Sequence, residues 1–554
     1  MRIRGARTWA LAAVAAVVAG TLAALPSPPR IAPTPSWRQA ATEVRGAYHV
    51  HTIRSDGGGT VDDAAAGAAR AGLQFVILSD HGDGTRRPDP PAYRHGVLCI
   101  DAVEISTRSG HYGVIGLGQA PYPLGGEARD VVEDVRRLGG FGIANHPLSP
   151  KAGLAWTDWE QPVDAIEWLN DDSLWRDAPR FRLALAAWTF AFRPAASLVS
   201  LYGRPAALDR ADRTASRRRV VLIAGADVHS RIGSRSGNWY VRVPSYESAF
   251  ETASIRVRIG APLGGDAATD ADAIVRAIRA GHLHSVVDGL AGPGAFDFAA
   301  ASGGVSAGEG DRLPLSGAVT VRAIANTPEG GFIVLLRDGR EIDRVSGGRL
   351  VYAGNRQGVY RAEVRLRALR GDGWVPWIVG NPVYVGTIDE PDPAPPAVAG
   401  EARPVADDLQ AWRVEAGEGS SGSVERDGPG VMLRYALAGR PGPPPDVSFV
   451  VRAFLDPRAE GFSFVGRADR PMRVVLRVRT GTDRGGATIG RSVYLDEMPR
   501  EVTVAVSDMR PVSASAPPSP GGLRDARIVV DTTNTRRGES GHLSVEGLRV
   551  IVPR

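Results

Sequence analysis

Histidine and acidic residues gather in short clusters in the N-terminal part of this 554-residue sequence. Neutral imidazole together with carboxylate suits divalent zinc, manganese or iron, whereas calcium prefers oxygen ligands alone and structural zinc usually recruits thiolates. The only cysteine is Cys99. The clusters are His49-Val50-His51 with Asp56, Asp80-His81, Glu104 with His111, His146, and Asp227-Val228-His229. These residue types predict a centre for several metal ions, with hydrolysis as its natural chemistry.

The clusters fall where apolar segments typical of buried strands end. The helix predicted between the first two of these strands covers Val61 to Ala71 and is stopped by Gly72. Strands alternating with helices favour an α/β barrel, in which functional residues lie at the strand ends on one face. The predicted strands are Gly46 to His51, Leu73 to Ser79, Val97 to Ile105, Tyr112 to Leu117, Gly140 to Ala144, Val163 to Leu169 and Val220 to Ala224.

Side chains two residues apart on a strand point the same way, so His49 and His51 should converge on one metal ion while Tyr48 faces elsewhere. Asp227 and His229 repeat this spacing. The carboxylate of Glu104 could bridge two cations through its two oxygens, and such bridging would organise a polynuclear site.

A cation lowers the pKa of the water bound to it, so hydroxide exists at neutral pH. The predicted nucleophile is therefore metal-bound water, and no protein nucleophile is assigned. Asp80 is a candidate for orienting the ligand His81, and its alternative role is that of a helix or turn cap. Glu167, at the end of the apolar run Val163 to Glu167, is expected to be a solvated carboxylate, and its alternative is a position that faces the mouth of the site.

Four other histidines lie outside the clusters and are expected to be surface or otherwise satisfied residues with no acidic companion. They are His95, His282, His284 and His542. Residues 171–219 interrupt the barrel pattern with helical segments that predict a lid or side wall. Most of the aromatic residues there, which include Trp175, Trp188, Phe190 and Phe192, are expected to pack in a core.

Together these motifs resemble the PHP superfamily, which is named for polymerase and histidinol phosphatase domains. The resemblance covers roughly residues 40–290 and is closest to the carbamate-hydrolase-like (CehA/McbA-type) branch of metallohydrolases. Its opening differs from the family pattern at Ala47, a position that is often acidic. The matching residues are His49-Val50-His51-Thr52, Ser55-Asp56-Gly57, Leu78-Ser79-Asp80-His81, Glu104, His111, Asn145-His146-Pro147 and Ala226-Asp227-Val228-His229.

The resemblance implies a distorted (βα)7 TIM-like barrel that holds two or three divalent metal ions, manganese, zinc or iron, at the carboxyl ends of its strands. By similarity, one ion would take His49, His51, Glu104 and Asp227. A second ion would share Glu104 and take His111 and His146, and a third would take Asp56, His81 and His229.

Residues 1–25 combine three early arginines with an apolar run from Trp9 to Leu25, which predicts a secretory signal peptide, with an N-terminal membrane anchor as the alternative. The protein would then be secreted or periplasmic. Loss of those arginines would reduce the formal net charge from +5 to +2, so no nucleic-acid-binding surface is evident.

The rest of the chain divides by composition. Residues 26–36 are a proline-rich spacer, 37–295 the metallohydrolase barrel, 296–386 a small Ig-like β-sandwich, 387–400 a linker and 401–554 a jelly-roll-like β-sandwich. The expected fold class is thus an α/β barrel followed by two all-β domains. The C-terminal domain is a candidate for contact with carbohydrate or the cell surface, on fold analogy alone.

Three functions remain open from the sequence. The first is an exported phosphoesterase that acts on a small-molecule ester through a di- or trinuclear metal cluster. The second is an amide, ester or carbamate hydrolase with the same cluster, because the ligands do not separate phosphorus from carbon. The third is a binding protein for a cell-surface polymer whose barrel is inactive.

Overall fold

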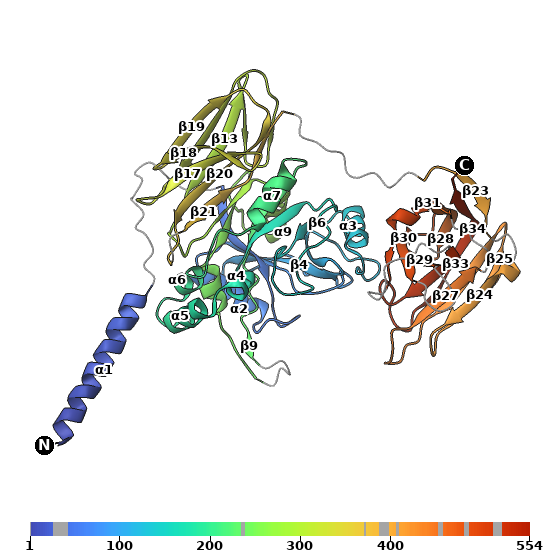
Figure 1. The fold of residues 1–554 in the computed structure, drawn as a ribbon, viewed down its shortest axis with the longest axis horizontal. Coiled ribbons are helices and arrows are strands. Elements are labelled where there is room, and N and C mark those ends of the chain that lie inside the picture. Colours follow the sequence, from blue (N-terminus) through green and yellow to red (C-terminus); the bar gives the residue numbers. More distant parts are fainter. Residues whose placement is uncertain are drawn as a thin grey trace. The chain divides into compact units, whose positions relative to one another are not determined.

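The computed structural model describes residues 2–25, 42–233, 239–370, 373–386, 398–405, 409–451, 458–480, 487–512 and 523–553. The predicted spacer 26–36 and most of the predicted linker 387–400 lie outside these residues. The chain forms two compact units (Figure 1). The first is Met1–Gly82, Pro88–Gly118 and Val135–Pro391, and the second is Asp83–Arg87, Gln119–Asp134 and Asp392–Arg554.

The first unit is built on a mixed sheet with the strand order β12-β11-β1-β2-β4-β5-β6-β7-β8. Strands β1 and β2, β2 and β4, β6 and β7, and β7 and β8 pair in parallel. Strand β5 is antiparallel to both of its neighbours, β4 and β6. An α/β domain with parallel strands is thereby confirmed, and β5 departs from a regular alternation of parallel strands and helices. The bounds are β1 Glu43–Val50, β2 Phe75–Leu78, β4 Val97–Thr107, β5 Gly110–Ile115, β6 Phe141–Ala144, β7 Ala165–Asn170, β8 Val221–Gly225, β11 Ser254–Arg258 and β12 Leu283–Val286.

The sheet curves until the residues that follow β8 meet β1. Val50 and Val228 form a parallel bridge. The amide of His51 donates to the carbonyl of Val228 at 3.1 Å, and the amide of Ala226 donates to the carbonyl of Tyr48 at 2.9 Å. This closure places the histidines at the end of β1 beside the residues that follow β8.

Small side chains let the helix after β1 pack closely on the sheet. This helix, α2 (Val61–Arg70), begins with a capping box between Thr60 and Asp63. Its alanines, Ala64, Ala65 and Ala68, are fully buried in a cluster with Val76 and Phe250. Helices α8 (Tyr246–Phe250) and α9 (Ala267–Ala280) follow β8, and α9 ends at the left-handed Gly281.

Four helices connect β7 to β8, where the sequence predicted helical segments. They are α4 (Asp171–Asp177), α5 (Arg180–Phe190), α6 (Pro194–Val199) and α7 (Ala207–Ala215). Helices α5 and α6 lie side by side (Figure 1) and are joined by a hydrogen bond from Ser197 to Thr189 of 2.8 Å. The expectation that most aromatic residues here pack in a core is wrong, because Trp175, Trp188 and Phe192 are 43%, 53% and 59% exposed.

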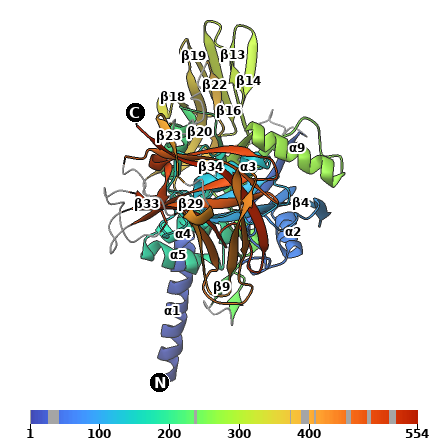
Figure 2. The same ribbon diagram turned by 90° about the vertical axis from the view of Figure 1, so that its right-hand side faces the viewer.

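The small β-sandwich belongs to the first unit rather than standing apart from it. Its first sheet has the order β14-β13-β16-β19 and projects as a layer of long strands in Figure 2. In its second sheet β20 and β21 pair antiparallel, and β21 also pairs with β12 of the mixed sheet. The boundary predicted near residue 295 therefore falls inside one compact unit. The bounds are β13 Phe296–Ser302, β14 Val305–Gly308, β15 Arg312–Leu313, β16 Val319–Ala325, β17 Phe332–Arg337, β18 Arg340–Ser346, β19 Arg349–Gly354, β20 Gly358–Arg367, β21 Trp374–Gly380 and β22 Val383–Val385.

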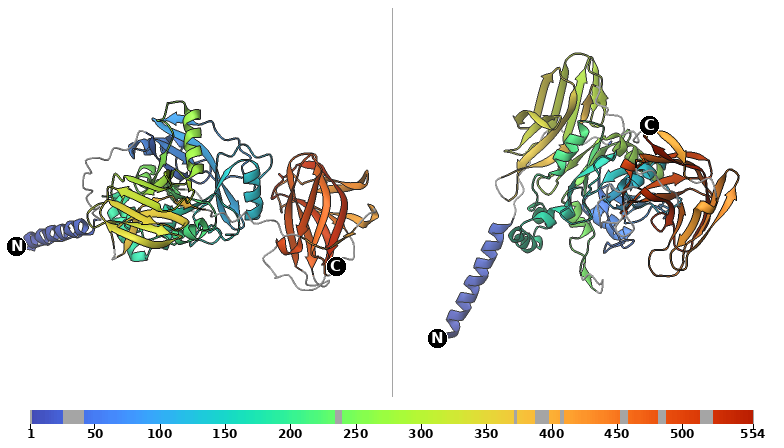
Figure 3. Two further views of the ribbon diagram at one scale, coloured as in Figure 1. Left: turned by 90° about the horizontal axis from the view of Figure 1, so that it is seen from above. Right: turned by 45° about the vertical axis from the view of Figure 1, so that its right-hand side comes forward.

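The C-terminal part of the second unit is a β-sandwich of two sheets, in agreement with the prediction (orange and red in Figure 3). One sheet has the order β25-β26-β34-β28-β31 with β23 on β34, and the other has the order β24-β27-β33-β29-β30-β32. Alternating side chains such as Leu433, Phe449, Phe462 and Leu543 form its core. The bounds are β23 Glu401–Pro404, β24 Trp412–Ala416, β25 Ser421–Asp427, β26 Gly430–Ala436, β27 Asp446–Val451, β28 Gly461–Ala468, β29 Met472–Thr480, β30 Thr488–Leu495, β31 Arg500–Ala505, β32 Arg510–Pro511, β33 Leu523–Asp531 and β34 Ser540–Val552. The second unit also contains Gln119–Asp134, a segment that the prediction assigned to the barrel.

The predicted signal or anchor segment forms helix α1 (Arg2–Ala24). Across the parts of the chain that the structure describes, no helix combines the length and the apolar character needed to cross a membrane. Cys99 is free and buried, as expected of a lone cysteine in a strand.

Candidate metal centre

All nine predicted metal-ligating residues come together at one end of the mixed sheet. His49 and His51 lie at the end of β1, Glu104 in β4 and His111 in β5, and the others follow β1, β2, β6 or β8. Their nitrogen and oxygen atoms fall into four overlapping groups, each with all ligand atoms within 4.8 Å of one another. The groups are His51, Asp56, His81 and His229; His49, His146 and Asp227; His49, His51 and Glu104; and His81, Glu104 and His111.

Glu104 stands at the middle of the cluster and is 1% exposed. Five imidazoles face its two oxygens, which is the arrangement expected of a bridging carboxylate. Its Oε1 lies 3.3 Å from His49 Nε2, 3.3 Å from His111 Nδ1 and 3.0 Å from His146 Nε2. Its Oε2 lies 3.4 Å from His51 Nε2 and 3.2 Å from His81 Nδ1.

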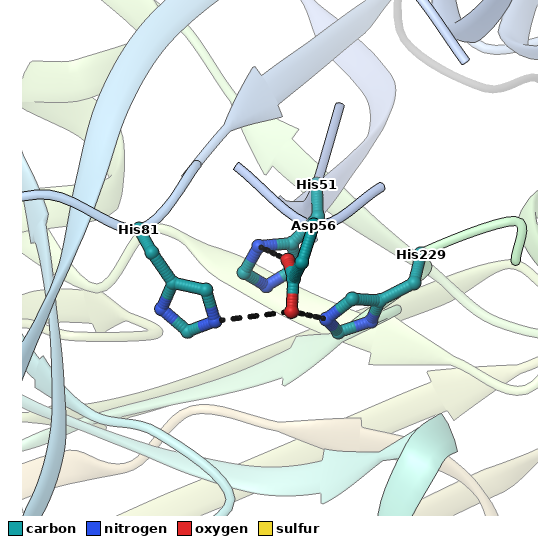
Figure 4. A group of neighbouring side chains, drawn as sticks. All are labelled: His51, Asp56, His81 and His229. Carbon is teal, nitrogen blue, oxygen red and sulfur yellow. Dashed lines mark ion pairs between the residues drawn. The ribbon is translucent and has the colours of Figure 1, made fainter. Parts of the chain in front are cut away.

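Two further carboxylates complete the cluster from opposite sides. Asp56, whose side chain is half exposed, faces three imidazoles in Figure 4: His229 at 3.2 Å, His51 at 3.6 Å and His81 at 3.7 Å. Asp227 Oδ1 lies 3.4 Å from His49 Nε2 and 3.3 Å from His51 Nε2. His51 therefore takes part in two groups, whereas the family resemblance assigned it to one.

The observed separations and the unpaired atoms fit bound divalent ions. Ligands that each lie about 2.1 Å from one ion are about 3.0 to 3.5 Å from one another, and most of the nitrogen–oxygen pairs above lie in that range. Several buried ligand atoms have no hydrogen-bond partner, a costly condition that a cation would relieve. These atoms are His49 Nε2, His51 Nδ1 and Nε2, His81 Nδ1, Glu104 Oε2 and His111 Nδ1.

Glu167 contacts two of the ligand candidates, His49 and His146, in line with the alternative that it faces the site. Its Oε1 lies 2.7 Å from His49 Nδ1, so the Nε2 lone pair of that ring is directed at the cluster. Its Oε2 accepts hydrogen bonds from the amide of His146 and from Asn170 Nδ2. Glu167 is fully buried, so the expectation of a solvated carboxylate is wrong. Gly225 leaves the necessary space, because a Cβ there would lie 1.6 Å from Glu167 Oε1.

A second buried chain of hydrogen bonds orients Glu104. Tyr48 donates to Asn145 Oδ1 at 2.6 Å, and Asn145 Nδ2 donates to Glu104 Oε1 at 2.9 Å. Gly113 makes room for this contact, since a Cβ there would lie 1.9 Å from the Tyr48 hydroxyl. Asn145 was visible in the sequence only as a neighbour of His146.

Asp80 positions the loop that carries Asp56. Its carboxylate accepts from the Thr52 amide at 2.7 Å, the Thr52 hydroxyl at 2.8 Å and the Ser55 hydroxyl at 2.6 Å. Asp80 thus has the predicted role of a turn cap, and it places Asp56 rather than the predicted His81.

The ligand-bearing backbone takes conformations that side chains other than glycine rarely adopt. His49, His146 and Asp227 have φ values of 67°, 29° and 43°. The pairing of β1 with β2 shifts register between Ala47 and Val50. His49 and His51 therefore meet the same carboxylates through an irregular strand end rather than through simple alternation, and the strain is typical of a functional site.

The carboxylates control the charge of the histidines in the metal-free protein. Burial alone would lower the pKa of His49, but Asp227, Glu167 and Glu104 raise it well above its usual value. Burial would likewise lower the pKa of His229, and the contact with Asp56 helps to raise it to about 9. Burial would raise the pKa of Glu104, yet the charge of His49 and the close contacts of His111 and His146 hold this pKa well below its usual value. Cations that bind here would displace these protons.

Asp171, at the start of α4, is a buried acid near the cluster that the sequence did not single out. Both of its carboxylate oxygens are buried and have no hydrogen-bond partner in the described structure. Burial raises its pKa well above the usual value, and the charges of Glu167 and Asp227 raise it further. Asp171 lines the same cavity as the ligands Glu104, His146 and Asp227.

The histidines outside the cluster have acidic companions, contrary to expectation. His282 lies 2.9 Å from Asp311, and His284 is fully buried 3.4 Å from Glu309. His542 lies 3.5 Å from Asp469. None of these three belongs to a group of potential metal ligands among the described residues. His95 is exposed, as predicted.

Comparisons with known proteins do not assign this site. No protein-family model matches the sequence, and no curated protein matches it. Among solved structures, a family 11 carbohydrate-binding module from Clostridium thermocellum in complex with a β-1,3-1,4-mixed-linked tetrasaccharide matches at 14% identity, over 28% of this chain and 98% of that chain, with a TM-score of 0.23. A structure titled for the promiscuous specificity of carbohydrate-binding modules from the β-sandwich superfamily matches at 11% identity, over 47% of this chain and 98% of that chain, with a TM-score of 0.21. Similarities this weak say nothing about function.

Proposed function

We propose that this protein is a metal-dependent hydrolase of the PHP type whose substrate is a phosphoester. The observation that supports it is the convergence of nine histidine and acidic side chains around Glu104, with buried ligand atoms that lack hydrogen-bond partners. In support of PHP membership, the ligands occur in that superfamily's order and lie at strand ends of a curved mixed sheet. The mixed sheet and its helices would then form a distorted (βα)7 barrel.

Bound divalent ions would activate water and stabilise negative charge on a phosphoryl oxygen. Two or three manganese, zinc or iron ions would be held by His49, His51, Asp56, His81, Glu104, His111, His146, Asp227 and His229. Glu104 would join neighbouring ions because its two oxygens face different imidazoles. Glu167 fixes the ring of His49 and Asp80 fixes the loop of Asp56, so the ligands are positioned in advance.

A substrate panel tests the reaction class. The purified full chain, incubated with manganese, zinc or iron, is assayed with a bis(4-nitrophenyl) phosphodiester, 4-nitrophenyl phosphate and a 4-nitrophenyl carbamate. We expect phosphoester turnover that His51→Ala abolishes and that the control His542→Ala, in the second unit, retains. Turnover of the carbamate alone would replace the phosphoesterase with an amide or ester hydrolase. No turnover of any substrate by metal-loaded protein would refute hydrolysis and leave polymer binding.

Export of the protein and carbohydrate contact by the C-terminal sandwich are also proposals. The first is supported by the arginines and apolar run of residues 1–25. The second rests on the sandwich architecture alone.

A further inference from the structure

The metal-ligand cluster opens into a cavity of about 740 Å³ that is much larger than the cluster itself. Asp56, His81, Glu104, His111, His146, Asp227 and His229 line one part of it. A cavity of this size lies in the upper half of the range typical of sites for drug-sized ligands. The reactive end therefore occupies only a fraction of the space that a substrate could fill.

The helices inserted between β7 and β8 line another part of the cavity with apolar side chains, beside the polar Asp171, Asp172 and Arg176 of α4. Leu174 and Trp175 of α4, Leu183 and Phe190 of α5, and Leu198 of α6 all line the cavity. These side chains keep some exposure, and Trp175 is 43% exposed. Such a wall gains free energy when an apolar ligand removes it from water.

The apolar surface continues to the outside of the first unit. Ile232, in β9 (Ile232–Gly233), and Val243 also line the cavity and are 55% and 36% exposed. A long apolar group could therefore extend from the metal ligands along the helices toward solvent, past the polar side chains of Asp171 and Asp172, which also line the cavity.

Cationic side chains stand in the same cavity. Lys151, the only lysine in the chain, lines it, as does Arg231, whose guanidinium lies 4.7 Å above the ring of Tyr240. Arg176 is there as well but is paired with Asp172 at 2.5 Å. Two cations beside the metal ligands favour an anionic group on the substrate.

We propose that the substrate is an anionic amphiphile, a phosphoester that carries an extended alkyl chain, with the phosphoryl group at the metal ligands and the chain along α4, α5 and α6. This inference rests on the proposed phosphoesterase function and adds the substrate class. In the reaction, the oxygen of water forms a bond to phosphorus, and the bond from phosphorus to the leaving oxygen breaks with its electron pair on that oxygen. A proton of the water passes to the leaving oxygen, and the alcohol separates from the phosphate product.

Chain length provides the direct test. The metal-loaded full chain is assayed with methyl, butyl and octyl 4-nitrophenyl phosphate, which share one leaving group. We expect kcat/KM to rise by about fourfold for each methylene group that becomes fully buried, so that the octyl diester exceeds the methyl diester by more than tenfold. Equal kcat/KM for the three diesters would overturn the inference while leaving the phosphoesterase proposal intact.

A cavity-filling variant identifies the wall. Ala187 lines the cavity on α5, and Ala184 is an exposed residue of the same helix outside it. Ala187→Trp should lower the octyl-to-methyl ratio of kcat/KM at least threefold, and the matched control Ala184→Trp should leave that ratio unchanged. An unchanged ratio in Ala187→Trp, with the variant folded by circular dichroism, would contradict the proposed chain position.

Binding supplies a readout that does not depend on turnover. Isothermal titration calorimetry compares octyl phosphate with methyl phosphate on the same protein, and we expect at least tenfold tighter binding of octyl phosphate. If no diester is hydrolysed, the proposed function fails, and calorimetry alone decides the amphiphile inference. Equal affinities for the two phosphates would then overturn the inference as well.

Discussion

Two buried clusters of charged groups in the first unit are built in opposite ways. Around Arg361, the guanidinium donates to Asp212 through two hydrogen bonds of 2.8 Å and to Glu363 at 2.7 Å, and Arg365 donates to Glu363 at 2.8 Å. Only Nη1 of Arg361 lacks a partner. Around Glu104, carboxylate oxygens face imidazole nitrogens at 3.0 to 3.4 Å, and several buried ligand atoms lack hydrogen-bond partners.

The difference separates a structural ion-pair network from a ligand site. The Arg361 cluster brings its own cation and is nearly complete as it stands, because each carboxylate is matched by a guanidinium. The Glu104 cluster has three carboxylates and six histidines with no arginine or lysine in ion-pair contact among the described residues. A cluster of buried charged groups therefore points to a ligand site when its polar atoms lack hydrogen-bond partners, as around Glu104.

The largest contrast is expected from removing the central carboxylate charge. Glu104→Gln should reduce the number of bound metal ions and lower turnover by more than about 100-fold, because even residues that only orient ligands contribute about 10- to 100-fold. Elemental analysis and steady-state kinetics measure both. Full metal content together with normal turnover would show that Glu104 is not a shared ligand.

A substitution in the Arg361 cluster should instead lower the stability of the folded protein. Arg361→Met leaves Asp212 buried without its cation and Glu363 paired with Arg365 alone, and it should lower the free energy of unfolding by about 3 to 5 kcal/mol. Urea unfolding monitored by circular dichroism measures the loss. Folded Arg361→Met should bind the same number of metal ions as the unaltered protein. The matched control is the triple variant that adds Asp212→Asn and Glu363→Leu to Arg361→Met, and it should recover part of the lost stability. If it recovers none, the unpaired carboxylate charges are not the cause of the loss.

A smaller effect on metal affinity is expected from Glu167, which contacts a ligand candidate. Glu167→Gln keeps the shape of the side chain but weakens its contact with His49 Nδ1, so metal affinity should fall by about 10- to 100-fold while the fold is kept. Metal titration by calorimetry gives the affinity. Glu160→Gln, at an exposed acid of the preceding loop, is the control and should bind metal normally. An unaltered affinity in Glu167→Gln would exclude a role in orienting His49.

The smallest effect concerns Asp171 and the stability of the metal-free protein. Its folded-state pKa is raised by burial and by the charges of Glu167 and Asp227, so the folded state binds the proton more tightly than the unfolded state does. Stability should therefore fall as pH rises from the usual carboxyl pKa of 3.8 toward the raised value.

Asp171→Asn should remove that loss and raise the free energy of unfolding at pH 7 by roughly 1 kcal/mol or more. Urea midpoints between pH 5 and pH 8 measure it, and Asp177→Asn, at the exposed end of the same helix, is the control. Lower stability of Asp171→Asn throughout this range would contradict the unfavourable burial of the acid.

The sequence predicted the ligand candidates because histidine and carboxylate at strand ends carry their own chemical signal. His49, His51 and Asp227 are recognisable from residue type and spacing alone. Glu167 and Asp171 are not, since whether a carboxylate at a strand or helix end is solvated depends on which segments cover it. Gly225 makes room for the buried Glu167, and the α4 segment buries the carboxylate of Asp171. Neither effect can be recognised from the local sequence.

The fold could be predicted from the sequence to about the same extent as the candidate site. Apolar runs located β1, β2, β4, β5, β6, β7 and β8 of the mixed sheet within a few residues, because buried strands are continuous in hydrophobicity. Strands β11 and β12 were not predicted. The antiparallel direction of β5 and the pairing of β12 with β21 depend on chain connections that local patterns do not encode. Trp188 likewise reads as a core residue by type, although it is 53% exposed on α5.

The central claim is that the Glu104 cluster is a site for divalent ions, and metal stoichiometry tests it most directly. The purified full chain is dialysed with manganese, zinc or iron and then against metal-free buffer, and bound ions are counted by inductively coupled plasma mass spectrometry beside a His51→Ala, Glu104→Gln variant. We predict two or three ions per chain, a higher unfolding midpoint with metal than without, and at most one ion in the variant. A folded protein that retains no ions and whose unfolding midpoint does not respond to any of the three metals would contradict the claim.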